Sequence, residues 1–98
     1  MRVLIIGGTG AFSGRVTERV VAAGHEVMLY NRGQRPLPDG VAVPVIRGER
    51  SALRDHAGEI AEFAPEAVID SICFQPEEAA DLVALFPQVR RVVFISSV

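Results

Sequence analysis

One segment near the amino terminus limits the possible folds more than any other. In it, a short apolar run passes directly into a glycine-rich turn and then into a helix. Residues 3–6 are all aliphatic, as in strands that are buried on both faces. The turn follows at once, with glycine at positions 7, 8, 10 and 14. The apolar residues that then share one helical face are Phe12, Val16, Val20 and Ala23. We predict a strand at Arg2–Ile6 and a helix over 11–23, capped by Gly24.

The rest of the chain alternates β-branched runs with helical periodicity, which is typical of βαβ units and a parallel sheet. Four further strands are predicted, at residues 27–30, 41–46, 67–72 and 91–95. Pro44 interrupts the third strand and indicates an edge position or a bulge. The pattern as a whole predicts an α/β protein of the Rossmann type, a doubly wound parallel sheet of five strands in the order 3-2-1-4-5.

Two more helices are predicted. One runs over residues 51–63 with Ser51 as its cap, and the other starts at Pro76, a residue that suits the first position of a helix. The residues expected to face the sheet are Leu53, Ala57, Ile60 and Ala64 in the former, and Leu82, Leu85 and Phe86 in the latter. At 98 residues the chain forms one domain at most. Because the fifth strand is usually central in this fold, we expect a truncated N-terminal part of a domain.

Composition and charge exclude several classes of function. The longest apolar runs are far shorter than the roughly 20 residues that span a bilayer, and no signal peptide is recognisable. With a net charge of −2 and scattered basic residues, a nucleic-acid partner is not expected. Cys73 is the single cysteine, so no internal disulfide forms and a reducing, cytoplasmic setting is expected.

The glycine turn is suited to a diphosphate. Glycine leaves no Cβ to block an anion from the backbone amides, and the helix start adds unpaired N–H groups and roughly half a positive charge. We predict that the pyrophosphate of a dinucleotide contacts Gly7, Gly8, Thr9, Gly10, Ala11, Phe12 and Ser13. The alternatives are a tight turn that binds nothing and a mononucleotide P-loop. The latter needs a lysine, and all ten basic residues here are arginine.

The end of the second strand predicts the choice of dinucleotide. An acidic residue there favours NAD, whereas arginine accommodates the additional phosphate of NADP. The strand ends at Asn31 and Arg32, with Arg35 close behind, so NADP is predicted and NAD is the alternative. Solvated loop arginines are the other interpretation of Arg32 and Arg35.

Other segments at the carboxyl ends of the strands are weaker candidates. Glu49, Ile72 and Cys73 are predicted to contact the cofactor, although each is more often structural, and Cys73 by default is a small buried hydrophobe. His25 and His56 are predicted to be structural, and no metal site is predicted. Asp70, inside the fourth strand, needs polar partners if it is buried.

These residues together resemble the extended or atypical short-chain dehydrogenase/reductases of the NAD-dependent epimerase/dehydratase type. The matching motifs cover the whole chain and are VLIIGGTG at 3–10, GHEV at 24–27, NRG at 31–33, GER at 48–50, AVID at 67–70 and VFISS at 93–97. The resemblance implies a Rossmann fold, a nicotinamide cofactor, and a small-molecule substrate such as a sugar nucleotide with a carbonyl or hydroxyl group. It also implies that Ser97 polarises the substrate oxygen.

Three departures from the family pattern qualify that resemblance. Ser13 stands at the third glycine, Glu49 stands where aspartate is frequent, and the family's Tyr-x-x-x-Lys pair is absent from these residues. Tyr30, the only tyrosine, is not followed by a lysine and does not replace that pair. The leading hypothesis is therefore an NADP(H)-binding segment of an oxidoreductase, epimerase or dehydratase that is inactive by itself.

Two alternatives belong to other classes. One is a non-catalytic dinucleotide-sensing regulator resembling NmrA-like proteins. The other is an S-adenosylmethionine-dependent methyltransferase, which would ordinarily want an acidic residue after the second strand, where Asn31 and Arg32 stand. Because an apolar final strand would expose an open edge, we expect the isolated chain to self-associate or to be marginally stable.

Overall fold

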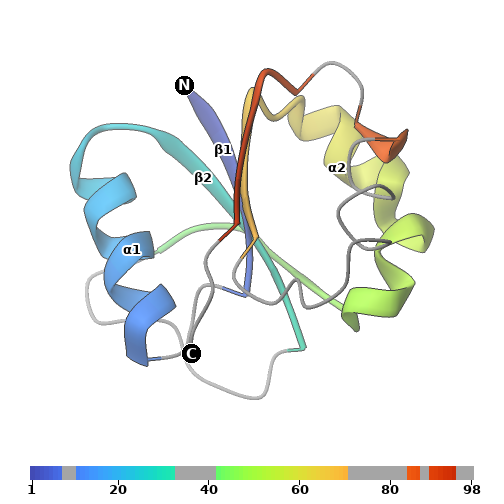
Figure 1. Ribbon diagram of the computed structural model, residues 1–98, viewed down its shortest axis with the longest axis horizontal. Coiled ribbons are helices and arrows are strands. Elements are labelled where there is room, and N and C mark those ends of the chain that lie inside the picture. Colours follow the sequence, from blue (N-terminus) through green and yellow to red (C-terminus); the bar gives the residue numbers. More distant parts are fainter. Residues whose placement is uncertain (8–10, 33–41, 71–83, 87–88, 95–98) are drawn as a thin grey trace.

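The computed structural model describes residues 1–7, 11–32, 42–70, 84–86 and 89–94. Five strands form one parallel sheet in the order β3-β2-β1-β4-β5, as predicted. Figure 1 shows α1 on one face of the sheet and α2 on the other. The elements are β1 (Arg2–Ile6), α1 (Ala11–Ala22), β2 (Glu26–Asn31), β3 (Val45–Arg47), the 3₁₀-helix η1 (Arg50–His56), α2 (Ala57–Phe63), β4 (Ala67–Asp70) and β5 (Arg91–Phe94).

Two apolar cores lie on opposite faces of the sheet because side chains alternate along each strand. The core on the α2 face contains Leu4, Ile6, Tyr30, Ile46, Leu53, Ile60, Val68 and Phe86. The core on the α1 face contains Val3, Ile5, Val27, Leu29 and Ala67, with Val20 and Val21 packed against it. The inward positions predicted for Leu53, Ile60 and Phe86 are confirmed, since each is at most 2% exposed.

The first βαβ unit follows the prediction closely. The strand spans Arg2–Ile6 as expected, and α1 begins at residue 11 and ends at Ala22, one residue earlier than predicted. Gly24 has a φ of 89°, the left-handed conformation that suits glycine after a helix. The second strand is longer than predicted by one residue at each end, at Glu26–Asn31.

The third strand is shorter than predicted. It begins at Val45 rather than at residue 41, because Pro44 has no N–H with which to continue the ladder. The Pro44 carbonyl still accepts a hydrogen bond of 2.9 Å from the N–H of Leu29. The predicted edge position is confirmed, since β3 pairs with β2 alone.

The helix predicted over residues 51–63 divides into two parts. It starts as η1 at Arg50, and the preceding residue is Glu49, so the predicted cap at Ser51 is wrong: Ser51 lies inside the first turn. Regular α-helix begins only at Ala57 and ends at Phe63. Ala64 then takes a left-handed φ of 55°, and its N–H donates to the carbonyls of Ile60 and Ala61.

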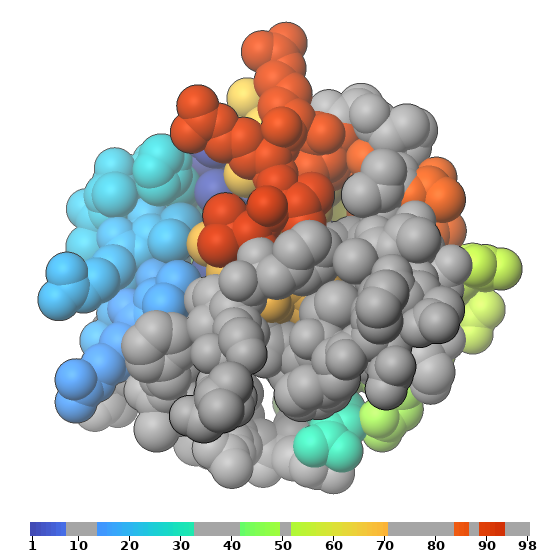
Figure 2. Space-filling view, in the orientation of Figure 1, coloured from blue at the N-terminus to red at the C-terminus, as the bar shows by residue number. Residues whose placement is uncertain are grey.

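The last strands form the other side of the sheet. β4 spans Ala67–Asp70 and β5 spans Arg91–Phe94, and β5 forms an edge of the described sheet. Figure 2 shows the red residues of β5 at the surface, and Val93 is 51% exposed. The helix predicted from Pro76, and Leu82 within it, lie outside the described residues. Among the helices that are described, none is long and apolar enough to cross a membrane.

Candidate functional site

The glycine turn lies at the carboxyl end of the central strand. Gly7 directly follows β1 with a φ of 96°, a conformation that glycine adopts without the steric strain of a Cβ. Its N–H donates a hydrogen bond of 2.8 Å to the carbonyl of Tyr30 on β2. The helix α1 then starts at Ala11, so that the chain turns from strand to helix within four residues. This turn is the context that a dinucleotide-binding motif requires.

The described residues include only part of the predicted diphosphate site. Gly8, Thr9 and Gly10 lie outside them. The backbone of residues 11–13, and thus of Ala11, Phe12 and Ser13, forms the first turn of α1. Gly14, one residue further, is buried. Gly14 lies one residue after Ser13, which we predicted to stand at the position of the third glycine.

Asn31 connects the end of β2 to the glycine turn. Its side chain is 7% exposed, and its Nδ2 donates a hydrogen bond of 3.4 Å to the carbonyl oxygen of Gly7. The sequence predicted Asn31 only as a residue that contacts the cofactor. The structure shows that its amide also fixes the glycine turn, which the sequence did not reveal because the two residues are 24 positions apart.

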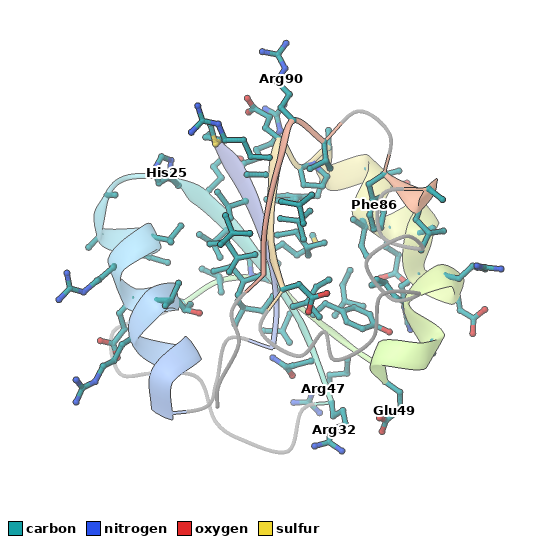
Figure 3. All side chains as sticks on the ribbon, viewed as in Figure 1. His25, Arg32, Arg47, Glu49, Phe86 and Arg90 are labelled. Carbon is teal, nitrogen blue, oxygen red and sulfur yellow. The ribbon has the colours of Figure 1, made fainter. Side chains whose placement is uncertain are left out.

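Two arginines extend from neighbouring strand ends beside this turn. Arg32 follows β2 and Arg47 is the last residue of β3, and both are exposed. Figure 3 shows both side chains at the same end of the molecule, opposite His25 and Arg90. Among the residues that the structure describes, neither guanidinium has an ion-pair partner. Arg35 lies outside the described residues.

A buried tyrosine organises the segment after β3. Tyr30 is 0% exposed, and its hydroxyl donates a hydrogen bond of 2.8 Å to the carbonyl of Glu49. The N–H of Gly48 donates to the carbonyl of Asn31 at 2.8 Å. The ring of His56 meets that of Tyr30 edge-on, with centroids 5.4 Å apart. These contacts hold the segment that carries the exposed side chain of Glu49 against the end of β2.

Gly48 is required by this arrangement. A Cβ at this position would press on the Tyr30 hydroxyl and would lie 2.9 Å from Cζ of Tyr30 and 3.0 Å from Nε2 of His56. The tyrosine ring is fully buried and has no room to move away. A glycine beside a strand often marks a close approach of two backbone segments, and this was a partial sequence signal for the role of Gly48.

Of the remaining candidates, Asp70 is among the described residues. Ile72, Cys73 and Ser97 lie outside the described residues. Asp70, the last residue of β4, is 0% exposed and is the register partner of Ile6. Within the described ranges, no group of three or more His, Cys, Asp or Glu side chains is placed to hold a metal ion.

Comparison with curated proteins identifies a similar reductase. The chain is 37% identical over 100 residues to the 2'-dehydrokanamycin reductase of Streptomyces kanamyceticus, an alignment that covers all of this chain and 28% of that protein. No family model matches the chain.

Solved structures share the fold. The NAD complex of WbmG from Bordetella bronchiseptica superposes with a TM-score of 0.75 at 20% identity, over 96% of this chain and 36% of that one. The NAD-bound UDP-glucose-4-epimerase of Stenotrophomonas maltophila has a TM-score of 0.79 at 18% identity, over 99% and 37%. The NAD complex of dTDP-glucose 4,6-dehydratase from Bacillus anthracis has a TM-score of 0.76 at 14% identity, over 99% and 37%.

The chain thus spans 28% of the curated reductase and 36–37% of these three solved chains. The predicted Rossmann-type sheet and its strand order are confirmed. The chain resembles, as its motifs predicted, the N-terminal portion of the extended short-chain dehydrogenase/reductases of the NAD-dependent epimerase/dehydratase type.

Proposed function

We propose that this chain is the NADP(H)-binding segment of an oxidoreductase, epimerase or dehydratase that acts on a sugar nucleotide or a similar carbonyl or hydroxyl substrate. The observation that carries the proposal is the strand-turn-helix at Gly7, with its φ of 96° and with α1 starting at Ala11. A curated relative named as a reductase and solved neighbours that contain NAD support it.

The residues fit the diphosphate of a dinucleotide. Gly7 opens the turn in a conformation that needs glycine, and the first turn of α1 presents N–H groups without intrahelical acceptors. In the proposed complex, the diphosphate contacts Gly7 and is held by the amides of residues 8–13, because the Gly7 N–H already donates to the carbonyl of Tyr30. Glu49, Ile72 and Cys73 are proposed as contacts further along the cofactor.

The preference for NADP follows from the end of β2. The last strand residue is the neutral Asn31, whose amide already bonds to Gly7, so no carboxylate there repels a phosphate. Arg32 follows and is exposed. A charge-assisted hydrogen bond contributes about 1.5–3 kcal/mol, so Arg32 would favour NADPH over NADH by about tenfold or more.

The chain's own residues bind and orient in this proposal. A bound nicotinamide would supply hydride exchange with the substrate carbon. Ser97 is proposed to polarise the substrate oxygen, which leaves the general acid/base step to groups that these 98 residues do not provide.

Titration with NADPH and NADH tests the proposal directly. The chain has no tryptophan, so the fluorescence of the reduced nicotinamide can be followed against a low protein background. We expect tighter binding of NADPH, and we expect Gly10→Asp to abolish it by placing a carboxylate at the diphosphate site.

Gly24→Asn is a matched control, because Gly24 lies at the other end of the sheet and asparagine tolerates its positive φ. The proposal is wrong if neither nucleotide binds, or if Gly10→Asp binds NADPH as well as the unmodified protein does.

A further inference from the structure

Arg47 occupies a position at the site that the sequence motifs do not single out. It is the last residue of the edge strand β3, it is exposed, and its register partner on β2 is Asn31. Arg32 is the next residue after Asn31. Two guanidinium groups therefore extend from adjacent strand ends on the same rim as the glycine turn (Figure 3).

The alternation of side chains places Arg47 on the α1 face of the sheet. Leu29 and its register partner Val45 both belong to the core on the α1 face, whereas Tyr30 and Ile46 belong to the opposite core. Because the period of a strand is two residues, Arg47 projects to the same face as Val45. This is the face covered by α1, whose first turn follows Gly7.

The backbone that follows Arg47 is held in place by two hydrogen bonds. The N–H of Gly48 donates to the carbonyl of Asn31 at 2.8 Å, and the Tyr30 hydroxyl donates to the carbonyl of Glu49 at 2.8 Å. A guanidinium on a fixed strand end loses less conformational freedom on binding an anion than one in a loop.

The two guanidinium groups at this rim form no ion pair with the residues that the structure describes. Arg2 at the other end of the sheet, by contrast, pairs with Glu66 at 3.6 Å. Arg32 is the residue after Asn31, which is directly opposite Arg47, so an anion bound between the two strand ends would be attracted by both positive charges. A phosphate monoester, with up to two negative charges, fits two guanidinium groups better than one.

We propose that Arg47 is a second specificity-determining residue, which binds together with Arg32 the phosphate monoester that distinguishes NADP(H) from NAD(H). The inference rests on the proposed function, because it assumes a dinucleotide at the glycine turn. It adds a residue on the edge strand to a specificity usually attributed to the end of the second strand.

Binding of NADPH and NADH to Arg47→Ala, Arg47→Lys and Arg32→Ala tests this inference. Allowing for solvent exposure, we expect Arg47→Ala to weaken NADPH binding by about five- to tenfold and to leave NADH binding unchanged. Arg47→Lys should recover part of the loss, because it keeps the charge but not the fork of donors. The same pattern is expected with the probes 2',5'-ADP and 5'-AMP.

Arg90→Ala is the matched control, an exposed arginine at the opposite end of the molecule (Figure 3), and should change neither affinity. Thermal denaturation of each variant verifies that it is folded. Raising the salt concentration should reduce the NADPH preference of the unmodified protein more than that of Arg47→Ala.

The outcomes separate this inference from the proposed function. If the unmodified protein binds neither nucleotide, the proposed function fails and Arg47 has no role to test. If NADPH is preferred and Arg32→Ala reduces that preference while Arg47→Ala behaves like Arg90→Ala, only the role of Arg47 is overturned. Equal weakening of NADPH and NADH by Arg47→Ala would also overturn it, because this would indicate a structural effect.

Discussion

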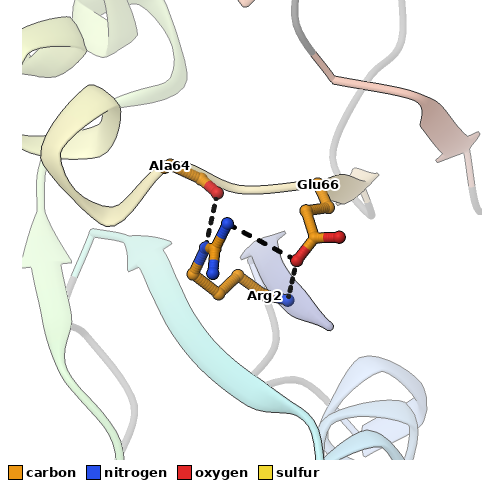
Figure 4. Close-up of polar contacts among 3 residues, drawn as sticks. All are labelled: Arg2, Ala64 and Glu66. Carbon is orange, nitrogen blue, oxygen red and sulfur yellow. Dashed lines mark hydrogen bonds and ion pairs between the residues drawn. The ribbon is translucent and has the colours of Figure 1, made fainter.

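The two ends of the parallel sheet differ in whether their charged side chains form ion pairs. At the amino end, the backbone N–H of Arg2 donates to Oε1 of Glu66 at 3.2 Å, and its Nε donates to the carbonyl of Ala64 at 2.8 Å (Figure 4). Backbone hydrogen bonds add to this contact, from Glu66 to Arg2 and from Arg90 to Glu66. At this end a cation and an anion of the chain satisfy each other.

At the carboxyl end, by contrast, two arginine side chains are exposed and form no ion pair within the described part of the chain. Gly7 is held by hydrogen bonds to Asn31 and Tyr30, while Arg32 and Arg47 extend without ion-pair partners among the described residues. The amino end therefore contributes stability, whereas the carboxyl end leaves charged side chains exposed at the edge where open α/β sheets generally bind their ligands.

The substitution expected to destabilise the fold most is at Gly48, which packs closely against Tyr30. Gly48→Ala should lower the free energy of unfolding by about 2–3 kcal/mol, because the new methyl group presses on the buried Tyr30 ring. Urea denaturation measures the loss. Gly58→Ala is the matched control: nothing lies within 4 Å of its Cβ, so alanine should be neutral or stabilise α2 by about 0.5–1 kcal/mol. Equal effects at both glycines would contradict this account.

Gly48→Ala should cost less in the Tyr30→Phe variant than in the unmodified protein. The hydroxyl is the atom that the new methyl group meets first, so its removal should lower the cost of Gly48→Ala by about 1 kcal/mol. A double-mutant cycle from denaturation curves gives this coupling, and a coupling near zero would show that the methyl group is accommodated elsewhere.

Asn31→Asp is expected to change the preference between NADPH and NADH. Asn31→Asp places a carboxylate at the end of β2 and replaces the donor to the Gly7 carbonyl by an acceptor. We expect the ratio of NADH to NADPH affinity to rise by about tenfold, equivalent to about 1.4 kcal/mol, because the carboxylate repels the phosphate. Glu26→Gln, at the other end of β2, is the control and should leave the ratio unchanged. An unaltered affinity ratio in Asn31→Asp would show that the end of β2 does not determine which nucleotide is preferred.

Loss of the tyrosine hydroxyl alone should have a smaller effect. Tyr30→Phe leaves the Glu49 carbonyl without the 2.8 Å hydrogen bond and should cost about 1 kcal/mol of unfolding free energy. Thermal denaturation followed by circular dichroism measures the change. A variant as stable as the unmodified chain would mean that water replaces the hydroxyl at no cost.

The smallest effect should come from the amino end. Glu66→Gln removes the ion pair with Arg2 but keeps an acceptor oxygen for its backbone N–H. The two side chains are 42% and 39% exposed, so the change should cost only about 0.5 kcal/mol and should leave nucleotide affinity unaffected. Altered affinity for NADPH would show that the two ends of the sheet are coupled.

Much of the architecture was predictable from local patterns. The aliphatic run before Gly7 predicted a doubly buried central strand, and β1 does pair on both sides, with β2 and β4. Gly24 predicted the end of α1 and adopts the positive φ that this role needs. Pro44 predicted an edge strand, although not that β3 begins only after it. Local sequence could not predict the 3₁₀ start at Arg50, since serine at position 51 suggested a different first residue.

Most strands and turns could be assigned from the amino-acid pattern, because apolar periodicity and the steric freedom of glycine act between near neighbours in the chain. Three contacts became visible only in the folded chain: Asn31 bonds to Gly7, Tyr30 holds the Glu49 segment, and Arg47 lies beside the end of β2. These contacts join residues 16 to 24 positions apart, at distances set by the register of parallel strands. No local pattern encodes that register, because it arises when two apolar cores pack on opposite faces of one sheet.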